Sequence, residues 1–415
     1  MKNEVYAVID LKSFYASCEC ANRGLDIFNT PLVVADKTRS PNSVVMSVTP
    51  YLKQKYGLSN VCRIGDLPND KNIIFATPRM SYYVEMSSNI VSLFLDYVSE
   101  EDLHVYSIDE SFLRLTPYLK LYGCNADELV ARIQKDIYER YHLIATSGMG
   151  PNMFLAKACL DNEGKKKPPY RSYWGIEDVP NTLWKLRSLT DFWGISGRTA
   201  NHLKRIGIRS VEGLAKADER LMKREFGVIG LELKALANGI DRTDITKKYT
   251  PKERSFSQGQ TLMRDYWPEE ALLILKETID ELCIRLRKAN QVSSLISVYV
   301  GDSDGGGFSR QRSLEIPSDD NDILLSVAKN IYHAHVEYRP IRSIGASFGK
   351  LRSYSGPIQF SLFENNEELR EKRTLRLTMD SINDIYGKNA ILSASSLLSE
   401  STIRERHGYI GGHRA

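Results

Sequence analysis

Three carboxylates lie in or at the ends of two apolar stretches that have the composition of β-strands. Asp109 and Glu110 sit within residues 104–113 (HVYSIDESFL), and Asp10 ends the apolar run at residues 5–10. An ionised acid is costly to remove from water, so such groups usually reach solvent at the end of a strand or find a cation. Because successive side chains of a strand point to opposite faces, Asp109 and Glu110 could share one site only near a hairpin bend.

Carboxylates at the ends of two strands could hold a pair of Mg²⁺ ions, which prefer oxygen ligands. Two such ions, roughly 3.5–4 Å apart, can stabilise both the attacking and the leaving oxygen of an in-line phosphoryl transfer. Each acid also has a simpler interpretation, since a single Asp after a strand is more often a turn or helix-cap residue than a metal ligand. The sequence around both motifs is needed to decide between these interpretations.

The pattern around the acids predicts the elements that must position them. Residues 4–10 have the pattern of a buried strand, and residues 13–22 that of the start of a helix. This corner exposes backbone N–H groups at residues 11–15, where an anionic triphosphate could bind. The elements that follow are a helix at residues 79–98, the strand pair around Asp109, a helix at 126–138 and a strand at 143–147. Together they give a βαββαβ order, which is the split arrangement of ferredoxin-like sheets.

The second half of the chain predicts a helical region and then another split unit. Residues 175–240 are expected to be helical, and residues 242–252 lack periodicity and are typical of an extended linker. A second βαββαβ unit follows the linker. Its strands are expected at residues 255–263, 295–300, 308–316 and 343–351, and its helices at residues 268–289 and 322–336.

Residues 189–208 have the form of a helix-hairpin-helix, with Gly194 and Gly197 in the hairpin and Gly207 after the second helix. Glycine lets the backbone approach a phosphate closely, and the second helix offers its N-terminal amides. Such contacts position DNA without reading its bases. Any tight turn between helices also uses glycine, so the motif alone does not establish DNA binding.

Composition narrows the class of protein. At 415 residues the chain is long enough for two to four domains, and 42% apolar with 26% charged residues is typical of a soluble globular protein. No apolar run approaches the roughly 20 residues of a membrane span, and we expect no signal peptide.

The six cysteines form no Cys-x-x-Cys pair, so we expect reduced thiols in a cytoplasmic protein and no zinc site. Basic residues outnumber acidic ones between residues 165 and 250, which fits either a polyanion-binding surface or a solvated face. Residues 165–171 are expected to form a surface loop.

Four motifs resemble those of the Y-family (translesion) DNA polymerases, most closely the branch that contains the catalytic subunit of the bacterial SOS mutagenesis polymerase. They are residues 9–19 (IDLKSFYASCE), 107–112 (SIDESF), 148–157 (GMGPNMFLAK) and 191–200 (DFWGISGRTA). The resemblance runs in order through about the first 350 residues. It implies an α+β multidomain right-hand polymerase with a ferredoxin-like palm, small fingers, a helical thumb and a split βαββαβ little finger. The implied boundaries are residues 1–13 and 79–174 for the palm, 14–78 for the fingers, 175–241 for the thumb, 242–252 for the linker, 253–352 for the little finger and 353–415 for the tail.

The resemblance also implies a function. The activity would be template-directed, low-fidelity DNA synthesis in translesion repair, as part of the SOS response to DNA damage and of mutagenesis. The implied partners are primer-template DNA, deoxynucleoside triphosphates and a sliding clamp of the β-subunit type. We expect no membrane partner and a monomeric polymerase in the cytoplasm.

Site residues follow from the resemblance by position. Asp10 and Asp109 would bridge two Mg²⁺ ions, with Glu110 on the ion that activates the primer 3′-oxygen and the carbonyl of Leu11 on the nucleotide side. Tyr15 matches the steric gate, whose ring excludes a 2′-hydroxyl, although a core aromatic is the alternative. The implied nucleotide-binding residues are Ser13, Phe14, Tyr15, Tyr51 and Lys157. The implied DNA contacts are Gly194, Ile195, Ser196, Gly197, Arg198 and Thr199, joined in the little finger by Arg254, Arg310, Arg312 and Arg342.

Two positions depart from the pattern of the family. The fingers helix normally reads Tyr-x-x-Arg-Lys, whereas this chain has Gln54 in place of the arginine, and either Lys53 or Lys55 could substitute. Arg114 stands where the family usually has an acid. These departures leave open a DNA- and clamp-binding relative without catalytic activity. Another two-metal enzyme, such as a nucleotidyl cyclase, is a third alternative, but it would not explain the hairpin motif or the second split unit.

The tail carries one further motif. Gln359, Phe360, Ser361, Leu362 and Phe363 resemble the pentapeptide by which bacterial polymerases bind the sliding clamp. A short extended segment with two adjacent large apolar residues suits a groove on a partner. We expect residues 364–400 to be partly helical and residues 401–415 to be mobile.

Overall fold

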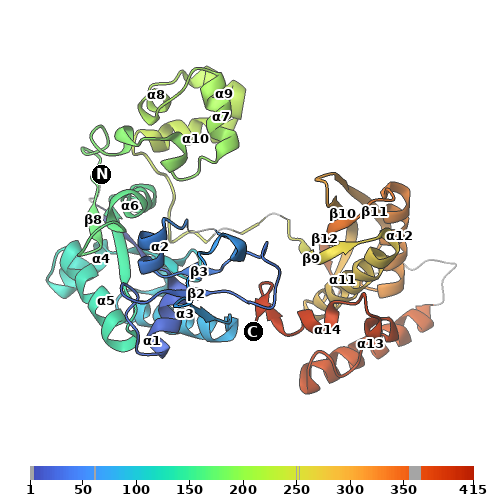
Figure 1. Cartoon of the computed structure of the whole chain (residues 1–415). Coiled ribbons are helices and arrows are strands. Elements are labelled where there is room, and N and C mark those ends of the chain that lie inside the picture. The colour runs from blue at the N-terminus through green and yellow to red at the C-terminus, as the bar shows by residue number, and fades with distance from the viewer. Residues whose placement is uncertain (1–3, 60–61, 249, 252, 355–365) are drawn as a thin grey trace. The chain divides into compact units, whose positions relative to one another are not determined.

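The structure is a computed structural model that describes residues 4–59, 62–248, 250–251, 253–354 and 366–415. It contains two compact units, Met1–Lys248 and Tyr249–Ala415 (Figure 1). The clamp-like pentapeptide at residues 359–363 lies outside the described residues. No helix in the described part of the chain is long and apolar enough to cross a membrane.

The N-terminal unit is built on a five-stranded sheet in the order β5-β6-β1-β7-β8. Its strands are β1 (Tyr6–Leu11), β5 (Leu103–Val105), β6 (Glu110–Arg114), β7 (Ala145–Gly150) and β8 (Arg171–Tyr173). The central strand β1 is antiparallel to β6 and to β7, and its register pairs Asp10 with Glu110 on one side and with Thr146 on the other. Cross-strand partners direct their side chains to the same face. The two acids therefore share one face of the sheet.

Helices cover both faces of this sheet. They are α1 (Phe14–Asn22), α3 (Met80–Leu95), α4 (Thr116–Tyr122), α5 (Ala126–Tyr141) and α6 (Met153–Cys159), which continues into a π-helical turn, η3 (Leu160–Gly164). The alternation of β1 divides the core, because Ala7 and Ile9 pack with α1, α3 and α5, whereas Tyr6 and Val8 pack with α6. Asp10 continues the second set, so it lies on the face of α6. The expected split βαββαβ order is confirmed, with α4 as an additional short helix.

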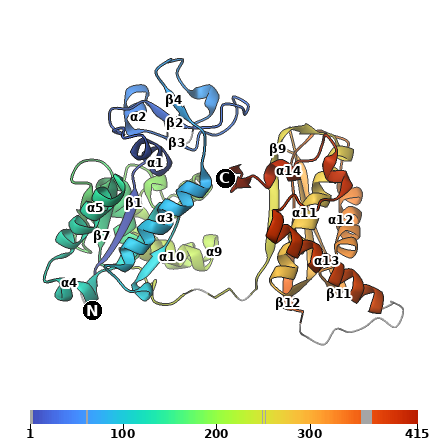
Figure 2. The same cartoon turned by 90° about the horizontal axis from the view of Figure 1, so that it is seen from below.

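A smaller sheet of order β3-β2-β4 lies beside α1 (Figure 2). Its elements are β2 (Leu32–Val34), β3 (Ser47–Val48), β4 (Ile74–Ala76), α2 (Pro50–Tyr56) and a 3₁₀ turn, η1 (Ile64–Asp66). Helix α2 begins with proline at its first position and ends at Gly57, whose φ of 65° is left-handed. Both features are common at helix ends. The buried side chain of Leu52 attaches α2 to the sheet, which leaves its lysines at the edges of the helix.

The last part of the N-terminal unit is helical. It contains the 3₁₀ turns η4 (Leu183–Lys185) and η5 (Leu189–Asp191) and the helices α7 (Gly197–Arg205), α8 (Val211–Ala215), α9 (Glu219–Phe226) and α10 (Val228–Ala237). The first helix of the expected helix-hairpin-helix is only the turn η5. A capping box closes it, because Ser188 donates its N–H to Asp191 and its hydroxyl accepts from the N–H of Thr190.

The C-terminal unit has the second split βαββαβ order, as expected. Its elements are β9 (Phe256–Tyr266), α11 (Pro268–Lys288), β10 (Gln291–Asp302), β11 (Gly307–Ser318), α12 (Asn321–His335) and β12 (Ile341–Ser353), with strand order β11-β10-β12-β9. Helices α11 and α12 cover one face of this sheet (Figure 1). On the other face Tyr299 lies across Gly345 and Gly259, where an added Cβ would come within 2.3 Å and 1.4 Å of its side chain. Only glycine fits beneath the tyrosine.

The tail is docked on the C-terminal unit. It forms α13 (Asn366–Tyr386), η6 (Ala394–Leu397), α14 (Ile403–Arg406), β13 (Tyr409–Ile410) and β14 (His413–Arg414). Buried Arg287 of α11 bonds to Asp380 of α13 at 2.6 and 3.1 Å. The prediction that residues 401–415 are mobile is wrong. Thr402 bonds to Glu277 of α11, and Arg406 bonds to Glu281 of the same helix.

Candidate active site

Asp109 and Glu110 lie at a hairpin bend, which is the arrangement that would allow these two adjacent side chains to share one site. The N–H groups of Tyr106 and Ser107 both donate to the carbonyl of Glu110, at 2.9 and 3.0 Å, and so close the bend between β5 and β6. The hydroxyl of Ser107 donates to Oδ1 of Asp109 at 2.7 Å. Asp109 is therefore the last residue of the bend, and Glu110 is the first residue of β6.

The bend is attached directly to the end of β1. Asp10 is the register partner of Glu110, and the N–H of Leu11 donates to the carbonyl of Asp109 at 2.9 Å. The structure thus brings the three predicted acids and Leu11 together at one end of the five-stranded sheet. The two acidic motifs are about a hundred residues apart in the sequence.

Two lysines lie against these acids. Lys157 of α6 is buried and places its Nζ 2.9 Å from Oε1 and 3.0 Å from Oε2 of Glu110, although only the contact with Oε2 has hydrogen-bond geometry. Lys165, which follows η3, places its Nζ 2.9 Å from Oδ2 of Asp10. Both lysines also bond to Asp161. Glu110 and Asp10 therefore each have a positive charge beside their carboxylate.

Burial raises the pKa of Asp10, while Lys165 lowers it and Asp109 adds to the rise. Burial likewise raises the pKa of Glu110, against the opposing effect of Lys157. A raised pKa means that the surroundings penalise the charged form of the acid. Additional positive charge at this end of the sheet would relieve that penalty.

The donor set fits a divalent cation of the Mg²⁺ type. It consists of three carboxylates and the carbonyl of Leu11, all oxygen ligands, and Oε1 of buried Glu110 makes no hydrogen bond. Within the residues that the structure describes, no group of three His, Cys, Asp or Glu is already spaced to hold a metal ion. The hydroxyl of Ser107 and the two lysines contact carboxylate oxygens of these same three acids.

The predicted nucleotide-binding residues lie in different places. Ser13 is the N-cap of α1, with a left-handed φ of 49°, and its hydroxyl accepts a hydrogen bond from Nζ of Lys53 at 3.0 Å. Phe14 is buried in the core of the sheet, so only its backbone could face a ligand. Tyr51 packs on the small sheet, and Lys157 contacts Glu110 as described above.

Two basic residues near this site were missed by sequence reasoning, namely Lys12 and Lys165. Lys12 donates from Nζ to the carbonyl of Lys165 at 3.0 Å. Burial lowers the pKa of Lys12 and also that of Lys53. The positive charge of Lys12 lowers the pKa of Lys53 further. Residues 165–171 were expected to form a surface loop, but the π-helical turn η3 directs Lys165 inward to Asp10. No periodic signal in the sequence predicts such a turn.

Tyr15 rests on a buried polar cluster. Its ring centroid is 4.9 Å from that of Tyr83, whose hydroxyl donates to Oε1 of Glu19 at 2.8 Å. Arg79 donates to the same carboxylate at 2.9 Å, and Arg23 bonds to its other oxygen. Burial raises the pKa of Tyr15, and the second cause is the charge of the nearby Asp109. Tyr15 therefore lies near Asp109, and its ring packs against the ring of Tyr83.

The hairpin at residues 194–199 exposes its backbone. Gly194 has a φ of 94°, and buried Ile195 anchors the turn in the helical core. Ser196 is the N-cap of α7, and Gly197 begins the helix. The first amides of a helix lack partners within it, so this end of α7 can donate to an anion.

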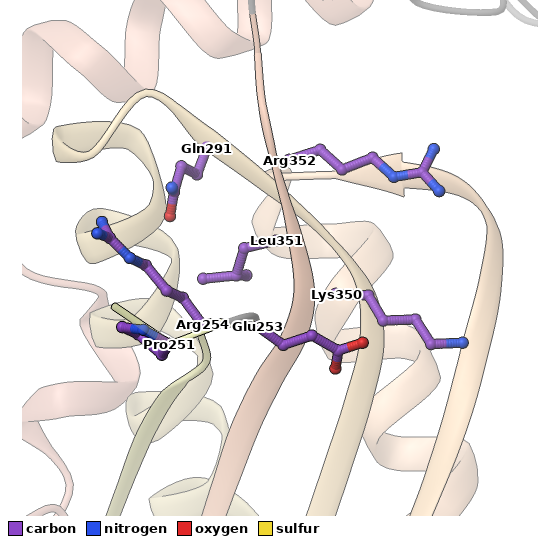
Figure 3. Close-up of a pocket in the computed structure, with 7 residues that line it drawn as sticks. All are labelled: Pro251, Glu253, Arg254, Gln291, Lys350, Leu351 and Arg352. Carbon is purple, nitrogen blue, oxygen red and sulfur yellow. The ribbon is translucent and has the colours of Figure 1, made fainter. Parts of the chain in front are cut away.

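The C-terminal unit has a basic pocket of about 530 Å³ (Figure 3). It is lined by Pro251, Glu253, Arg254, Gln291, Lys350, Leu351 and Arg352. Figure 3 shows Lys350 and Arg352 directed away from Arg254 and Gln291, and both are exposed. Of the arginines expected to contact DNA, Arg254 lines this pocket, while Arg342 forms an ion pair with Asp265 at 3.2 Å.

Comparison with known proteins identifies the family. The sequence model of the impB/mucB/samB family matches residues 9–161, and that of the C-terminal domain of the same family matches residues 253–362. The putative UV-damage repair protein UvrX of Bacillus subtilis (strain 168) is 34% identical over 411 residues, which cover 98% of this chain and 97% of the relative. The chain belongs to the Y-family of translesion DNA polymerases.

Further matches agree with this family. DNA polymerase IV 2 of the same Bacillus strain is 30% identical over 419 residues and is covered to 99% of its length. A solved structure, the Y-family DNA polymerase chimera Dbh-Dpo4(243-245)-Dbh, has the same fold, with a TM-score of 0.67 and 22% identity over 84% of this chain and 99% of that chain. The expected family and the right-hand polymerase fold are confirmed. The narrower placement beside the SOS mutagenesis subunit stays a prediction.

The polar cluster beneath Tyr15 makes the polymerase sensitive to loss of Glu19. Burial alone would raise the pKa of Glu19, but hydrogen bonds from Arg79, Arg23 and Tyr83 lower it below its ordinary value. We expect Glu19→Gln to reduce the free energy of unfolding by about 2 kcal/mol at pH 7, measured by urea denaturation.

The pH dependence of this effect has a defined sign. Because the pKa of Glu19 is lowered on folding, its stabilisation is complete above the unfolded value near 4.5 and is lost as the pH falls through the folded value. The difference between wild type and Glu19→Gln should therefore shrink below about pH 4.5. Glu139→Gln, in an exposed pair with Lys135, is the control and should change stability by less than about 0.5 kcal/mol. A pH-independent difference would contradict the assignment.

Proposed function

We propose that this polymerase adds deoxynucleotides to a primer 3′ end under the direction of a template, and that it does so at the acids on β1 and β6. The observation that carries the proposal is the register that pairs Asp10 with Glu110, with Asp109 at the adjoining bend. The family supports DNA-directed DNA synthesis past damage, which is the activity of translesion polymerases.

Two Mg²⁺ ions are the proposed cofactors. Asp10 and Asp109 would hold both, with Glu110 on the primer side and the carbonyl of Leu11 on the nucleotide side. When bound, such ions lower the pKa of the attacking hydroxyl and neutralise charge that develops on the phosphates. The chain itself supplies the oxygen ligands, the helix N-terminus at Ser13, and the lysines that flank it. Positioning and charge neutralisation provide most of the rate in phosphoryl transfer, so no covalent nucleophile is required.

The alternative functions find less support. Arg114, one of the two departures that left an inactive relative open, lies at the far end of β6. It is bonded to Glu4 at 2.9 and 3.0 Å and to Asp102 at 3.3 Å. Glu4 and Asp102 thus neutralise the charge of Arg114, which lies four residues along β6 from Glu110. A nucleotidyl cyclase would need neither the hairpin before α7 nor the second split unit.

Several finer assignments belong to the same proposal. The hairpin at residues 194–199 and the basic pocket near Arg254 would contact the DNA backbone without reading sequence. The pentapeptide at residues 359–363 would bind a sliding clamp of the β-subunit type. We also propose that the polymerase acts as a monomer in the cytoplasm, where six unpaired cysteines remain reduced.

Replacement of Asp109 tests the catalytic assignment. Asp109→Asn keeps the size of the side chain but removes its charge, so we expect primer extension with Mg²⁺ to fall at least about 100-fold, with DNA binding retained. Asp96→Asn, in an exposed pair with Arg140, is the matched control and should extend at the wild-type rate. Binding without extension by the wild type would support the inactive relative, and product formed without a template would support the cyclase.

Replacement of Tyr15 tests the steric gate. Tyr15→Ala should open space beneath the sugar, so the preference for deoxyribonucleotides over ribonucleotides, measured as a ratio of kcat/KM, should fall at least about tenfold. Tyr141→Ala removes a tyrosine that bonds to the carbonyl of Asn89 and should leave sugar selection unchanged. An unaltered ratio in Tyr15→Ala would show that Tyr15 is only a core aromatic.

Replacement of the pentapeptide tests clamp binding. The double variant Leu362→Ala and Phe363→Ala should lose stimulation of synthesis by the sliding clamp and keep clamp-free synthesis, because a groove-binding segment depends on its large apolar residues. The control is Leu397→Ala with Leu398→Ala, which removes an exposed apolar pair from the same tail and should keep stimulation. Equal stimulation in both variants would overturn the clamp assignment.

A further inference from the structure

Three ammonium groups gather at the corner between β1 and α1. Lys53 reaches this corner from α2, with its Nζ 3.0 Å from the hydroxyl of Ser13. Lys12 precedes Ser13 and bonds to the carbonyl of Lys165, whose own Nζ is 2.9 Å from Asp10. The three lysines come from three separate parts of the chain, so folding alone brings them together. Like charges repel unless an anion lies between them, and within this group of lysines only Lys165 is in salt-bridge contact with carboxylates.

The three lysines are not equally compensated. Lys165 forms ion pairs with Asp10 and with Asp161, at 2.9 and 3.1 Å. Lys12 and Lys53 are half-buried, yet neither forms an ion pair with any residue that the structure describes. Both ammonium groups have lost part of their water, and the charge of Asp10 acts on them only from beyond salt-bridge distance. Such a pair of cations favours the binding of an anion from outside the chain.

The backbone at Ser13 leaves room for that anion. Its left-handed φ of 49° and ψ of 49° turn the side chain away from the usual capping position, and it makes no cap hydrogen bond to α1. The hydroxyl faces Lys53 instead. Helix α1 has nine residues, and its first amides are available at the same corner as the two lysines. A polyanionic group could contact both kinds of donor at once.

The structure distinguishes Lys53 from Lys55, the two residues that could substitute for the arginine missing at Gln54. Lys55 lies on the other side of α2, with its Nζ 3.5 Å from Asp70 and 5.0 Å from the ring centre of Tyr56. It is exposed and already has a carboxylate partner. Only Lys53 is directed to Ser13.

We propose that Lys53, with Lys12, binds the β- and γ-phosphates of the incoming nucleotide and so replaces the arginine that is absent at Gln54. This assignment rests on the proposed polymerase function and adds the residues that hold the triphosphate in this chain. An ammonium group binds phosphate as a point charge and does not depend on the fixed geometry of a guanidinium fork, so it can act from a neighbouring position on the helix.

Lys53→Gln tests the assignment, because glutamine can still bond to Ser13 but carries no charge. The measurement is the dissociation constant of a non-hydrolysable α,β-imido deoxynucleoside triphosphate for the complex of polymerase, primer and template in Mg²⁺. We expect Lys53→Gln to weaken this binding about tenfold, equivalent to about 1.4 kcal/mol. We also expect its KM for nucleotide to rise, DNA affinity to stay unchanged, and Lys53→Arg to bind within about threefold of wild type.

Lys55→Gln is the matched control on the same helix and should bind the triphosphate as tightly as wild type. Equal affinity in Lys53→Gln and wild type would overturn the assignment, and so would equal weakening in Lys53→Gln and Lys55→Gln. These results are distinct from a failure of the proposed function. In that case wild-type protein itself would neither bind the triphosphate nor extend the primer, and both proposals would fall.

Discussion

The pairing register between β1 and β6 is the constraint on which the site depends. Because side chains alternate along a strand, a slip of one residue would move Asp10 from the face of α6 to the face covered by α3 and α5. An unpaired carboxylate there would lie in an apolar core. The apolar partners on both strands, such as Val8 opposite Phe112, fix the register. Packing in the core thus determines where the acids meet.

The acids and both split units could be predicted from sequence, whereas several side-chain contacts could not. The strand pattern around Asp10 and Asp109 depends on residues that are close in the sequence, so it can be recognised without knowledge of the fold. The inward turn of Lys165 depends on a π-helical turn, which has no sequence period. Which of Lys53 and Lys55 faces Ser13 depends on how α2 packs beside β1, and this tertiary packing cannot be read from the local sequence. Docking of residues 401–415 depends on acids of α11 that are distant in sequence.

The departures from the family pattern become intelligible in this structure. Gln54 leaves the fingers helix without its arginine, yet Lys53 on the same helix places a charge beside Ser13. Arg114 replaces an acid, and Glu4 with Asp102 provides the carboxylates that it needs. In both cases a charge has moved or found new partners while the acids of β1 and β6 keep their register.

The ion pairs of Lys157 with Glu110 and of Lys165 with Asp10 have a consequence for folding. Structural metal sites often cannot form without their ion, because bare ligands repel one another. Here Lys157 and Lys165 lie beside Glu110 and Asp10, so two of the three acids have a counter-ion within the chain itself. For the proposed Mg²⁺ ions, folding of the protein and binding of the ions would therefore be separate events. The protein would then fold at a low magnesium concentration and bind the proposed ions afterwards.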